Sequence, residues 1–277
     1  MAGATEWSGE QGAKWAAAID PMDRQVAPAT QHAMAALAAR PGERIIDLGC
    51  GGGATSLEIA EAVGAQGAVF GVDISPDLVE IARSRGAQID HLTFEVADAA
   101  THPFQEQGWD AVFSRFGCMF FDEPAEALAN LRAGVKADGR AVLTVWAEPK
   151  HNPWAMIPAR AAAQVLGPAE KVPPGAPGPF GWATPDIFMP ILQDAGWRDI
   201  AFEEHEIECP IGPEASTDPV ASAIDHAARI GPMARRLEEA PEAIHQIRPI
   251  LADALAPMVR DGAVYLPGRI RVISATA

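Results

Sequence analysis

Short apolar runs alternate with longer segments of helical character through the first half of the chain. Each run has the length and the aliphatic content of a buried strand. The predicted strands are residues 44–48, 68–74, 92–98, 109–115 and 141–146, and the predicted helices between them are residues 54–63, 76–86 and 124–133. Ser75 and Pro76 have the residue types that favour the first positions of a helix. This alternation predicts an α/β fold with a mostly parallel sheet and helices on both faces.

The pattern changes after the fifth predicted strand. Residues 148–183 are rich in proline and glycine, which predicts a loop-rich segment with one helix near residues 155–166. A helix from Thr184 to about Gly196, a strand at 200–207, helices through 214–260 and a last strand at 264–275 follow. Pro267 and Gly268 interrupt the last strand, which predicts that it is bent or lies at the edge of the sheet.

The first 40 residues are alanine-rich and have helical character, with Trp7 and Trp15 on roughly one face. We expect this segment to cover the core. The resulting division is an N-terminal helical lid (1–40), a core (41–147), a loop-rich substrate segment (148–183) and the rest of the core sheet with a helical insertion at about 214–260 (184–277).

The segment RIIDLGCGGG, residues 44–53, contains the most informative local pattern. Gly49, Gly51 and Gly53 follow a buried strand at alternate positions and lead into a helix. Glycine permits positive φ and lacks Cβ, so backbone amides can approach a ligand closely. Asp47, at the end of the strand, can orient this turn or meet an ammonium group. The pattern predicts a site for a nucleotide-type cofactor.

Acidic residues also end the next two predicted strands, where an adenosine would lie. Asp73 comes 20 residues after Gly53, and a carboxylate there can accept hydrogen bonds from ribose hydroxyls. Asp98 can accept one from an adenine amino group, while its small neighbours Ala97 and Ala99 let the ring lie flat. The residues that follow the fourth strand, at the same edge of the sheet, are Ser114, Arg115 and Phe116.

Charge and cysteine content narrow the classes of partner. The chain has 277 residues and a formal net charge of −16, which argues against nucleic acid or an acidic membrane as a partner. Its three cysteines are scattered and none has CxxC spacing, so we expect no disulfide framework, no metal site and a cytoplasmic location. The N-terminus does not look like a signal peptide, and no apolar stretch has the length of a membrane span. A homodimer is left open.

Four motifs in order resemble one family. DLGCGGG at 47–53, GVDIS at 71–75, VADA at 96–99 and DAVFSRFGCMFF at 110–121 resemble class I S-adenosylmethionine-dependent methyltransferases. The similarity is to the bacterial branch of ubiquinone/menaquinone-biosynthesis methyltransferases, with a methyltransferase type 11/25-like domain. NPW at 152–154 and PGPFGWATPD at 177–186 also resemble that branch. The resemblance implies a Rossmann-like, seven-stranded core that transfers methyl from S-adenosyl-L-methionine to O, N or C of a small molecule, releasing S-adenosyl-L-homocysteine.

The resemblance also implies roles for individual residues. The glycines would approach the methionine part, Asp73 the ribose, and Asp98 with Ala99 the adenine, under a lid that includes Trp15. The full set of expected cofactor-binding residues is Asp47, Gly49, Cys50, Gly51, Gly53, Asp73, Ile74, Ala97, Asp98, Ala99, Ser114, Arg115, Phe116 and Trp15.

Two alternatives stay open. Gly49-x-Gly51-x-x-Ala54 also satisfies the GxGxxA pattern of NAD-dependent dehydrogenases, although nothing after the fourth strand resembles a hydride-transfer base. The chain could also bind S-adenosylmethionine without transferring methyl, as a sensor or as a non-methylating catalyst.

The acceptor is not defined by the sequence. A series of aromatic residues around the predicted pocket suits an aromatic or cationic acceptor. His151 follows the fifth strand at the same edge of the sheet and is our candidate for a general base, with an exposed loop histidine as the alternative interpretation. Asn152-Pro153-Trp154 also resembles the Asn-Pro-Pro-aromatic loop of nucleic-acid amino-methyltransferases, but its position and the net charge argue against methylation of bases.

Overall fold

The structure is a computed structural model that describes residues 9–213 and 216–277. Its sheet has the strand order β3-β2-β1-β4-β5-β8-β6, and a short β7 pairs with β8 beside this path. The strands are β1 (Arg44–Leu48), β2 (Ala68–Asp73), β3 (Leu92–Val96), β4 (Trp109–Arg115), β5 (Val135–Trp146), β6 (Arg198–Ile211), β7 (Val259–Arg260) and β8 (Ala263–Thr276). The pairs from β3 through β5 are parallel, and β8 runs antiparallel to both β5 and β6. The predicted mostly parallel α/β fold is confirmed.

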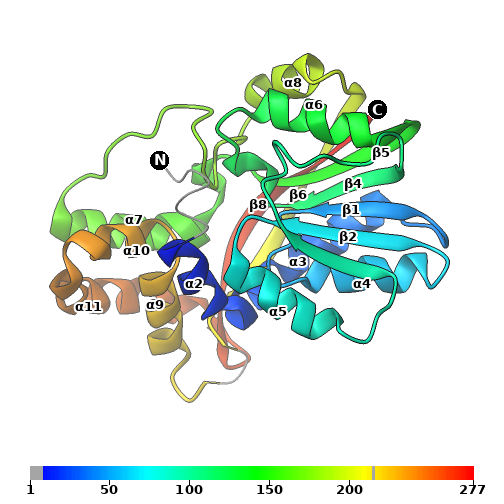
Figure 1. Ribbon diagram of the computed structural model, residues 1–277. Helices are drawn as coiled ribbons and strands as arrows, with labels where there is room; N and C mark the ends of the chain where they lie inside the picture. The colour runs from blue at the N-terminus through cyan, green and yellow to red at the C-terminus, as the bar shows by residue number, and fades with distance from the viewer. Residues whose placement is uncertain (1–8, 214–215) are drawn as a thin grey trace.

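Helices cover both faces of the sheet (Figure 1). The described helices are α2 (Glu10–Ala16), α3 (Ile19–Leu37), α4 (Ala54–Val63), α5 (Pro76–Gly86), α6 (Pro124–Gly134), α7 (Pro153–Leu166), α8 (Pro185–Asp194), α9 (Pro219–Arg229), α10 (Pro232–Glu239) and α11 (Ile244–Leu255). Helices α3, α4 and α5 lie on one face, and α6 with α8 on the other. Single turns of 3₁₀ helix are η1 (Cys118–Phe120), η2 (Pro149–His151), η3 (Pro241–Ala243) and η4 (Ala256–Met258). The central strands are buried from both sides, with Ile46, Val112 and Leu143 inaccessible to solvent.

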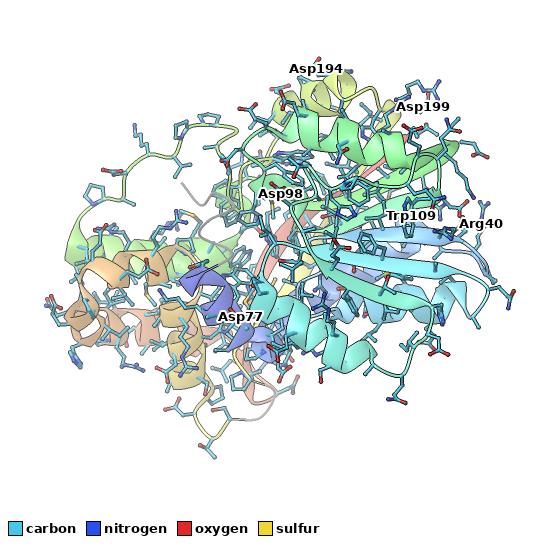
Figure 2. All side chains as sticks on the ribbon, viewed as in Figure 1. Arg40, Asp77, Asp98, Trp109, Asp194 and Asp199 are labelled. Atoms are coloured by element: carbon cyan, nitrogen blue, oxygen red, sulfur yellow. The ribbon has the colours of Figure 1, made fainter. Side chains whose placement is uncertain are left out.

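A second group of helices stands apart from the sheet. Helices α7, α9, α10 and α11 pack on one another, and α2 lies between this group and the sheet (Figure 1). We call α2, the first turns of α3 and this group the lid. Figure 2 shows Asp98, just after β3, on the side that faces the lid, and Trp109, at the start of β4, at the opposite end of the sheet. The carboxyl ends of the parallel strands therefore face the lid.

Two local predictions need correction. The fifth strand, predicted at 141–146, begins at Val135. The turn-like residues 137–139 lie inside β5, because a register shift against β4 lets one continuous strand absorb them. The last strand, β8, lies between β5 and β6 and is not an edge strand. Its Pro267 pairs with β6 only, beyond the last residue that pairs with β5, and proline is tolerated at such a position. The predicted cap of α5 is confirmed, since the Leu78 amide donates to Ser75 Oγ at 3.4 Å.

No helix in the described ranges has both the length and the apolar character needed to cross a bilayer. Trp7, which the sequence placed on a helical face with Trp15, lies outside the described residues.

Candidate functional site

A cavity of about 480 Å³ opens where the carboxyl ends of β1, β2 and β4 meet the lid. The sheet side of its wall comes from the glycine turn, from Asp73 and from the segments after β3 and β4. The lid side comes from α2, α3, α7, α9, α10 and α11. Ligands of open α/β sheets bind at this edge. The cavity is therefore the candidate site.

The glycine turn brings bare backbone to the cavity. Gly49 and Gly51 both have positive φ, +66° and +53°. A Cβ on Gly49 would lie 2.8 Å from Cα of Gly117, so a larger residue would push the turn away from the end of β4. A Cβ on Gly51 would meet nothing within 4 Å, which leaves open space over its backbone on the cavity wall. Cys50 lines the same wall, and burial raises the pKa of its thiol well above its usual value.

Asp73 links the turn to the next strand. Its carboxylate accepts hydrogen bonds from the Gly51 amide and the Ser75 amide, both at 2.9 Å. Burial raises the pKa of Asp73, and these amide donors offset part of that effect. A carboxylate has about four acceptor positions, so Asp73 retains capacity to accept from a ligand hydroxyl. Asp73 and its neighbour Ile74 both line the cavity, as expected.

The wall after β3 is also formed as predicted. Asp98 lines the cavity together with Ala97 and Ala99, and one of its oxygens accepts from the Ala100 amide at 2.9 Å. The second oxygen makes no hydrogen bond within the described parts of the chain. Small side chains on either side of a carboxylate leave room for a flat ring that presents an amino group. The residues present therefore fit the adenosine part of S-adenosylmethionine.

Three of the predicted cofactor residues do not reach the cavity. Asp47 is fully buried behind the turn, where it accepts hydrogen bonds from Thr55 Oγ1 at 2.7 Å and Ser56 Oγ at 2.5 Å. Ser114 is fully buried and donates to the Leu48 carbonyl at 2.9 Å, which ties β4 to β1. Gly53 precedes α4 as its N-cap residue. These three residues lie outside the lining of the cavity and support the turn, and a direct contact with the cofactor stays a prediction for each.

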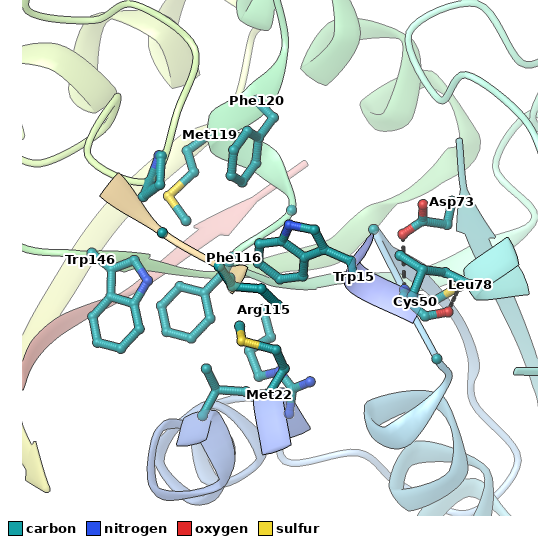
Figure 3. Close-up of a pocket in the computed structure, with 18 of the residues that line it drawn as sticks. Trp15, Met22, Cys50, Asp73, Leu78, Arg115, Phe116, Met119, Phe120 and Trp146 are labelled. Carbon is teal, nitrogen blue, oxygen red and sulfur yellow. Dashed lines mark hydrogen bonds between the residues drawn. The ribbon is translucent and has the colours of Figure 1, made fainter. Parts of the chain in front are cut away.

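An ion-pair network fixes α3 to this turn. Asp23 accepts from Arg85 at 2.8 Å and from Arg115 at 3.3 Å. Arg85 also donates to the Gly52 carbonyl at 2.9 Å, and Arg115 to Thr30 Oγ1 at 2.7 Å. Asp23 and Arg115 line the cavity (Figure 3 labels Arg115 beside Met22). The start of α3 is therefore held at the cofactor end of the cavity by charge.

Replacing Asp23 with alanine should loosen the lid. The side chains of Asp23 and Arg115 are 20% and 12% exposed, so removing the carboxylate leaves a largely buried guanidinium without its counterion. We expect a loss of about 1–3 kcal/mol in the free energy of unfolding. We also expect faster hydrogen exchange in α2 and the first turns of α3, measured by mass spectrometry.

Asp20→Ala is the matched control for this change. Asp20 accepts from the same Arg85, but its side chain is 85% exposed. An exposed ion pair contributes little to stability, so this variant should behave like the wild type. Equal effects of the two variants would contradict the assignment of Asp23 as the residue that holds the lid.

Aromatic side chains form the wall beyond the cofactor end. Phe116 and Trp146 stack with ring centroids 4.3 Å apart and planes 6° from parallel, and Trp154 follows at 4.7 Å from Trp146. All three line the cavity, and we call them the aromatic wall. Phe116 has φ +65°, an uncommon conformation for a side chain of this size. In the view of Figure 3, Trp15 is drawn between Asp73 and the Phe116–Trp146 pair.

His151 does not line the cavity, so the prediction of a general base there is not supported. It ends the η2 turn and is not among the lining residues. The adjacent Asn152 is fully buried and has a structural role. Its amide donates to the Ala147 carbonyl at 2.9 Å, and its oxygen accepts from the Arg269 amide at 3.0 Å. A ligand-binding role for the Asn-Pro-Trp segment is therefore limited to Trp154.

Sequence reasoning missed a pair of polar residues on the lid side. Gln25 of α3 and His226 of α9 both line the cavity, and Gln25 Oε1 lies 2.8 Å from His226 Nε2. Both are buried, with 3% and 8% of their surface exposed. Burial, together with a smaller effect of the nearby Arg229, lowers the pKa of His226 to about 4. No local signal marks either residue, because they are 201 positions apart and each lies in an ordinary amphipathic helix.

Comparison with known proteins agrees with the fold and with the resemblance of the motifs. A family model described as a methyltransferase domain matches residues 45–139. Aklanonic acid methyltransferase DauC of Streptomyces sp. (strain C5) is 35% identical over 105 residues, which cover 37% of this chain and 48% of that protein. Demethylmenaquinone methyltransferase of Renibacterium salmoninarum is 26% identical over 175 residues, which cover 60% and 71%. The chain thus spans about half of the first of these relatives.

Solved structures share the fold. An S-adenosylmethionine-dependent methyltransferase from Aquifex aeolicus superimposes with a TM-score of 0.50 at 18% identity, covering 69% of this chain and 86% of that one. The YcgJ protein from Bacillus subtilis gives 0.56 at 16% identity, covering 89% and 97%. The [4+2]-cyclase SpnF gives 0.52 at 16% identity, covering 89% and 80%.

The family match places a methyltransferase domain at residues 45–139, and the chain shares the fold of solved S-adenosylmethionine-dependent methyltransferases. The resemblance deduced from the sequence is confirmed. Of the fourteen predicted cofactor residues, the cavity brings together Trp15, Gly49, Cys50, Gly51, Asp73, Ile74, Ala97, Asp98, Ala99, Arg115 and Phe116.

Proposed function

We propose that this chain transfers the methyl group of S-adenosylmethionine to a small, largely apolar, aromatic acceptor. One observation carries the proposal: a single cavity is lined by Asp73 and the glycine turn at one end and by the aromatic wall at the other. A donor held at the first end would present its methyl group to a molecule held against the second. The relatives point in the same direction, since one of them is a demethylmenaquinone methyltransferase and therefore named for a quinone.

The residues of the chain supply position and a dry environment. When bound, the donor provides a methyl group on a positively charged sulfur. Asp73 and Asp98 would hold the nucleoside through its hydroxyl and amino groups. The apolar rings of Phe116, Trp146 and Trp154 exclude water and orient a flat acceptor. Holding reactants in line contributes much of the acceleration in such a transfer, and a water-poor pocket favours the loss of charge from sulfur.

The test combines binding with transfer. Calorimetry should show that S-adenosylhomocysteine binds with one site per chain. Donor labelled in its methyl group should then pass label to members of a panel of fused-ring phenols and quinones. Absence of S-adenosylhomocysteine binding would contradict the proposal.

A second candidate is binding of S-adenosylmethionine without transfer. The observation behind it is the fold shared with SpnF, a [4+2]-cyclase and thus a protein named for a reaction other than methylation. This candidate would be favoured if S-adenosylhomocysteine binds tightly and no label passes to any acceptor of the panel. The cytoplasmic location expected from the sequence stays a prediction.

A further inference from the structure

The lid side of the cavity is almost entirely apolar. The lining residues that α3, α7, α9, α10 and α11 contribute are mainly Met, Val, Ile, Leu, Ala, Pro and Trp side chains. The polar side chains among these lining residues are Asp23, Gln25 and His226. Asp23 is engaged by two arginines, as described above. The Gln25–His226 pair is therefore the polar feature that an acceptor against this wall would meet.

The hydrogen bond between the two side chains defines the state of the imidazole. An amide oxygen only accepts, so His226 Nε2 donates its proton to Gln25 Oε1 across 2.8 Å. A neutral imidazole carries one proton, and Nδ1 therefore retains its lone pair. No residue within the described ranges donates a hydrogen bond to Nδ1. The ring thus offers an acceptor of hydrogen bonds at a buried, apolar cavity wall.

We propose that the acceptor of this chain carries one neutral hydroxyl group on an aromatic skeleton, and that His226 receives its proton during methyl transfer. This inference rests on the proposed function. It assigns His226 as a catalytic residue and Gln25 as the positioning residue that fixes its tautomer. The buried Nδ1 selects for a ligand that can donate a hydrogen bond to it, because an apolar ligand would leave this nitrogen unsatisfied.

The step balances as follows. A lone pair of the hydroxyl oxygen forms the bond to the methyl carbon, while the bond between that carbon and sulfur breaks and its electron pair stays on sulfur. The hydroxyl proton passes to His226 Nδ1 and then to water. The products are a methyl ether, the neutral thioether S-adenosylhomocysteine and one proton.

A neutral base is available over a wide range of pH. Because the pKa of His226 is lowered to about 4, the ring stays unprotonated at neutral pH. Arg229 lies on the same helix, and Asp23 of α3 lines the same cavity two residues before Gln25. The lining residues from the elements packed on α9 are uncharged: Ile211, Met233, Leu255 and Leu266.

The first experiment measures recognition of the hydroxyl. The two probes are 2-naphthol and naphthalene, which share one ring skeleton and differ by that group. Equilibrium dialysis with S-adenosylhomocysteine present should give wild-type protein a preference for 2-naphthol of about three- to tenfold, the value of one hydrogen bond. His226→Asn should abolish the preference and leave the calorimetric affinity for S-adenosylhomocysteine unchanged. His151→Asn, outside the cavity, is the matched control and should behave like the wild type.

The second experiment measures transfer. With labelled donor, His226→Asn should lower kcat for 2-naphthol by about 100-fold or more, as expected for loss of a general base. Gln25→Glu should retain the hydrogen bond and favour the imidazolium, and the acidic limb of its pH–rate profile should move upward by at least one pH unit. A merely structural role of Gln25 would not move that limb. Gln25→Glu keeps the test decisive if thermal melting shows that His226→Asn is unstable.

Three results would overturn the proposal: equal affinity of the wild type for the two probes, an unchanged preference in His226→Asn, or binding of neither probe. Each can occur while S-adenosylhomocysteine still binds and label still passes to another acceptor. Failure of this inference is therefore distinguishable from failure of the proposed function, which loss of S-adenosylhomocysteine binding would show.

Discussion

Replacing Asp73 with alanine should reduce the affinity for S-adenosylhomocysteine by about 100-fold or more. The carboxylate would hold the ribose hydroxyls, and each hydrogen bond to a charged group contributes about 1.5–3 kcal/mol. The structure adds a second reason. Asp73 also accepts from the amides of Gly51 and Ser75, so its loss frees the glycine turn itself. Titration calorimetry measures the effect.

The control for Asp73→Ala is Asp77→Ala, four residues further along the chain. Asp77 is exposed in the first turn of α5 and does not line the cavity (Figure 2). Its replacement should leave the affinity unchanged. Asp73→Asn tests the carboxylate more narrowly than Asp73→Ala. Its amide oxygen can still accept from one backbone N–H, while its NH₂ group faces the other N–H. Unchanged affinity in Asp73→Ala would contradict the assignment of this end of the cavity.

Replacing Arg271 with methionine should produce the largest loss of stability. Arg271 is 4% exposed and holds both ends of the 148–183 segment to β8. Its guanidinium contacts Glu148 at 2.7 Å, Glu204 at 2.6 Å and the Ala183 carbonyl. Breaking a buried ion pair on one side costs about 3–5 kcal/mol, and the partly exposed carboxylates favour the lower figure. We expect Tm to fall by on the order of 10 °C.

Arg269→Met is the control for that variant. Arg269 lies two residues away on β8, and its side chain is 28% exposed and pairs with the exposed Glu206. Its replacement should change stability by less than about 1 kcal/mol. Similar melting curves for the two variants would show that the contacts of Arg271 do not stabilise the segment.

The same contacts predict a dependence on pH. Burial alone would raise the pKa of Glu148. The hydrogen bond and the charge of Arg271, a backbone amide and the charge of Lys150 together outweigh it and lower the pKa to about 2. A carboxylate with a depressed pKa stabilises the fold above its usual pKa of 4.5, and this contribution is lost as the pH falls toward 2. In Arg271→Met that part of the acid sensitivity should disappear from melting curves recorded between those limits.

Local pattern was enough to predict the core and the cofactor end of the site. The strands from β1 to β4 are short apolar runs with clear ends, and a parallel sheet brings those ends to one edge. That geometry alone predicts that Asp73, Asp98 and the glycine turn lie at one edge of the sheet. The same geometry does not predict the positions of Asp47 and Ser114. Strands buried on both faces show no alternation of polar and apolar residues, so the sequence does not indicate to which face of the sheet their side chains point.

The acceptor end depends on contacts between distant segments. Gln25 and His226 meet because α3 and α9 pack over one cavity, and no periodicity within either helix encodes that meeting. The prediction of a base at His151 lacked the same kind of information. A position just after a strand defines the edge of the sheet, but it does not determine whether the residue lines the cavity, and His151 does not.

The geometry of Trp146 and Trp154 has an optical consequence. Two indoles whose ring centroids are 4.7 Å apart and whose planes are inclined by 46° couple their electronic transitions, and such a chiral pair produces an exciton couplet in circular dichroism. The couplet depends on the mutual orientation of the rings and vanishes when they separate. We therefore expect the protein to carry an intrinsic spectroscopic signature of the assembled aromatic wall, which can be followed in solution without any label.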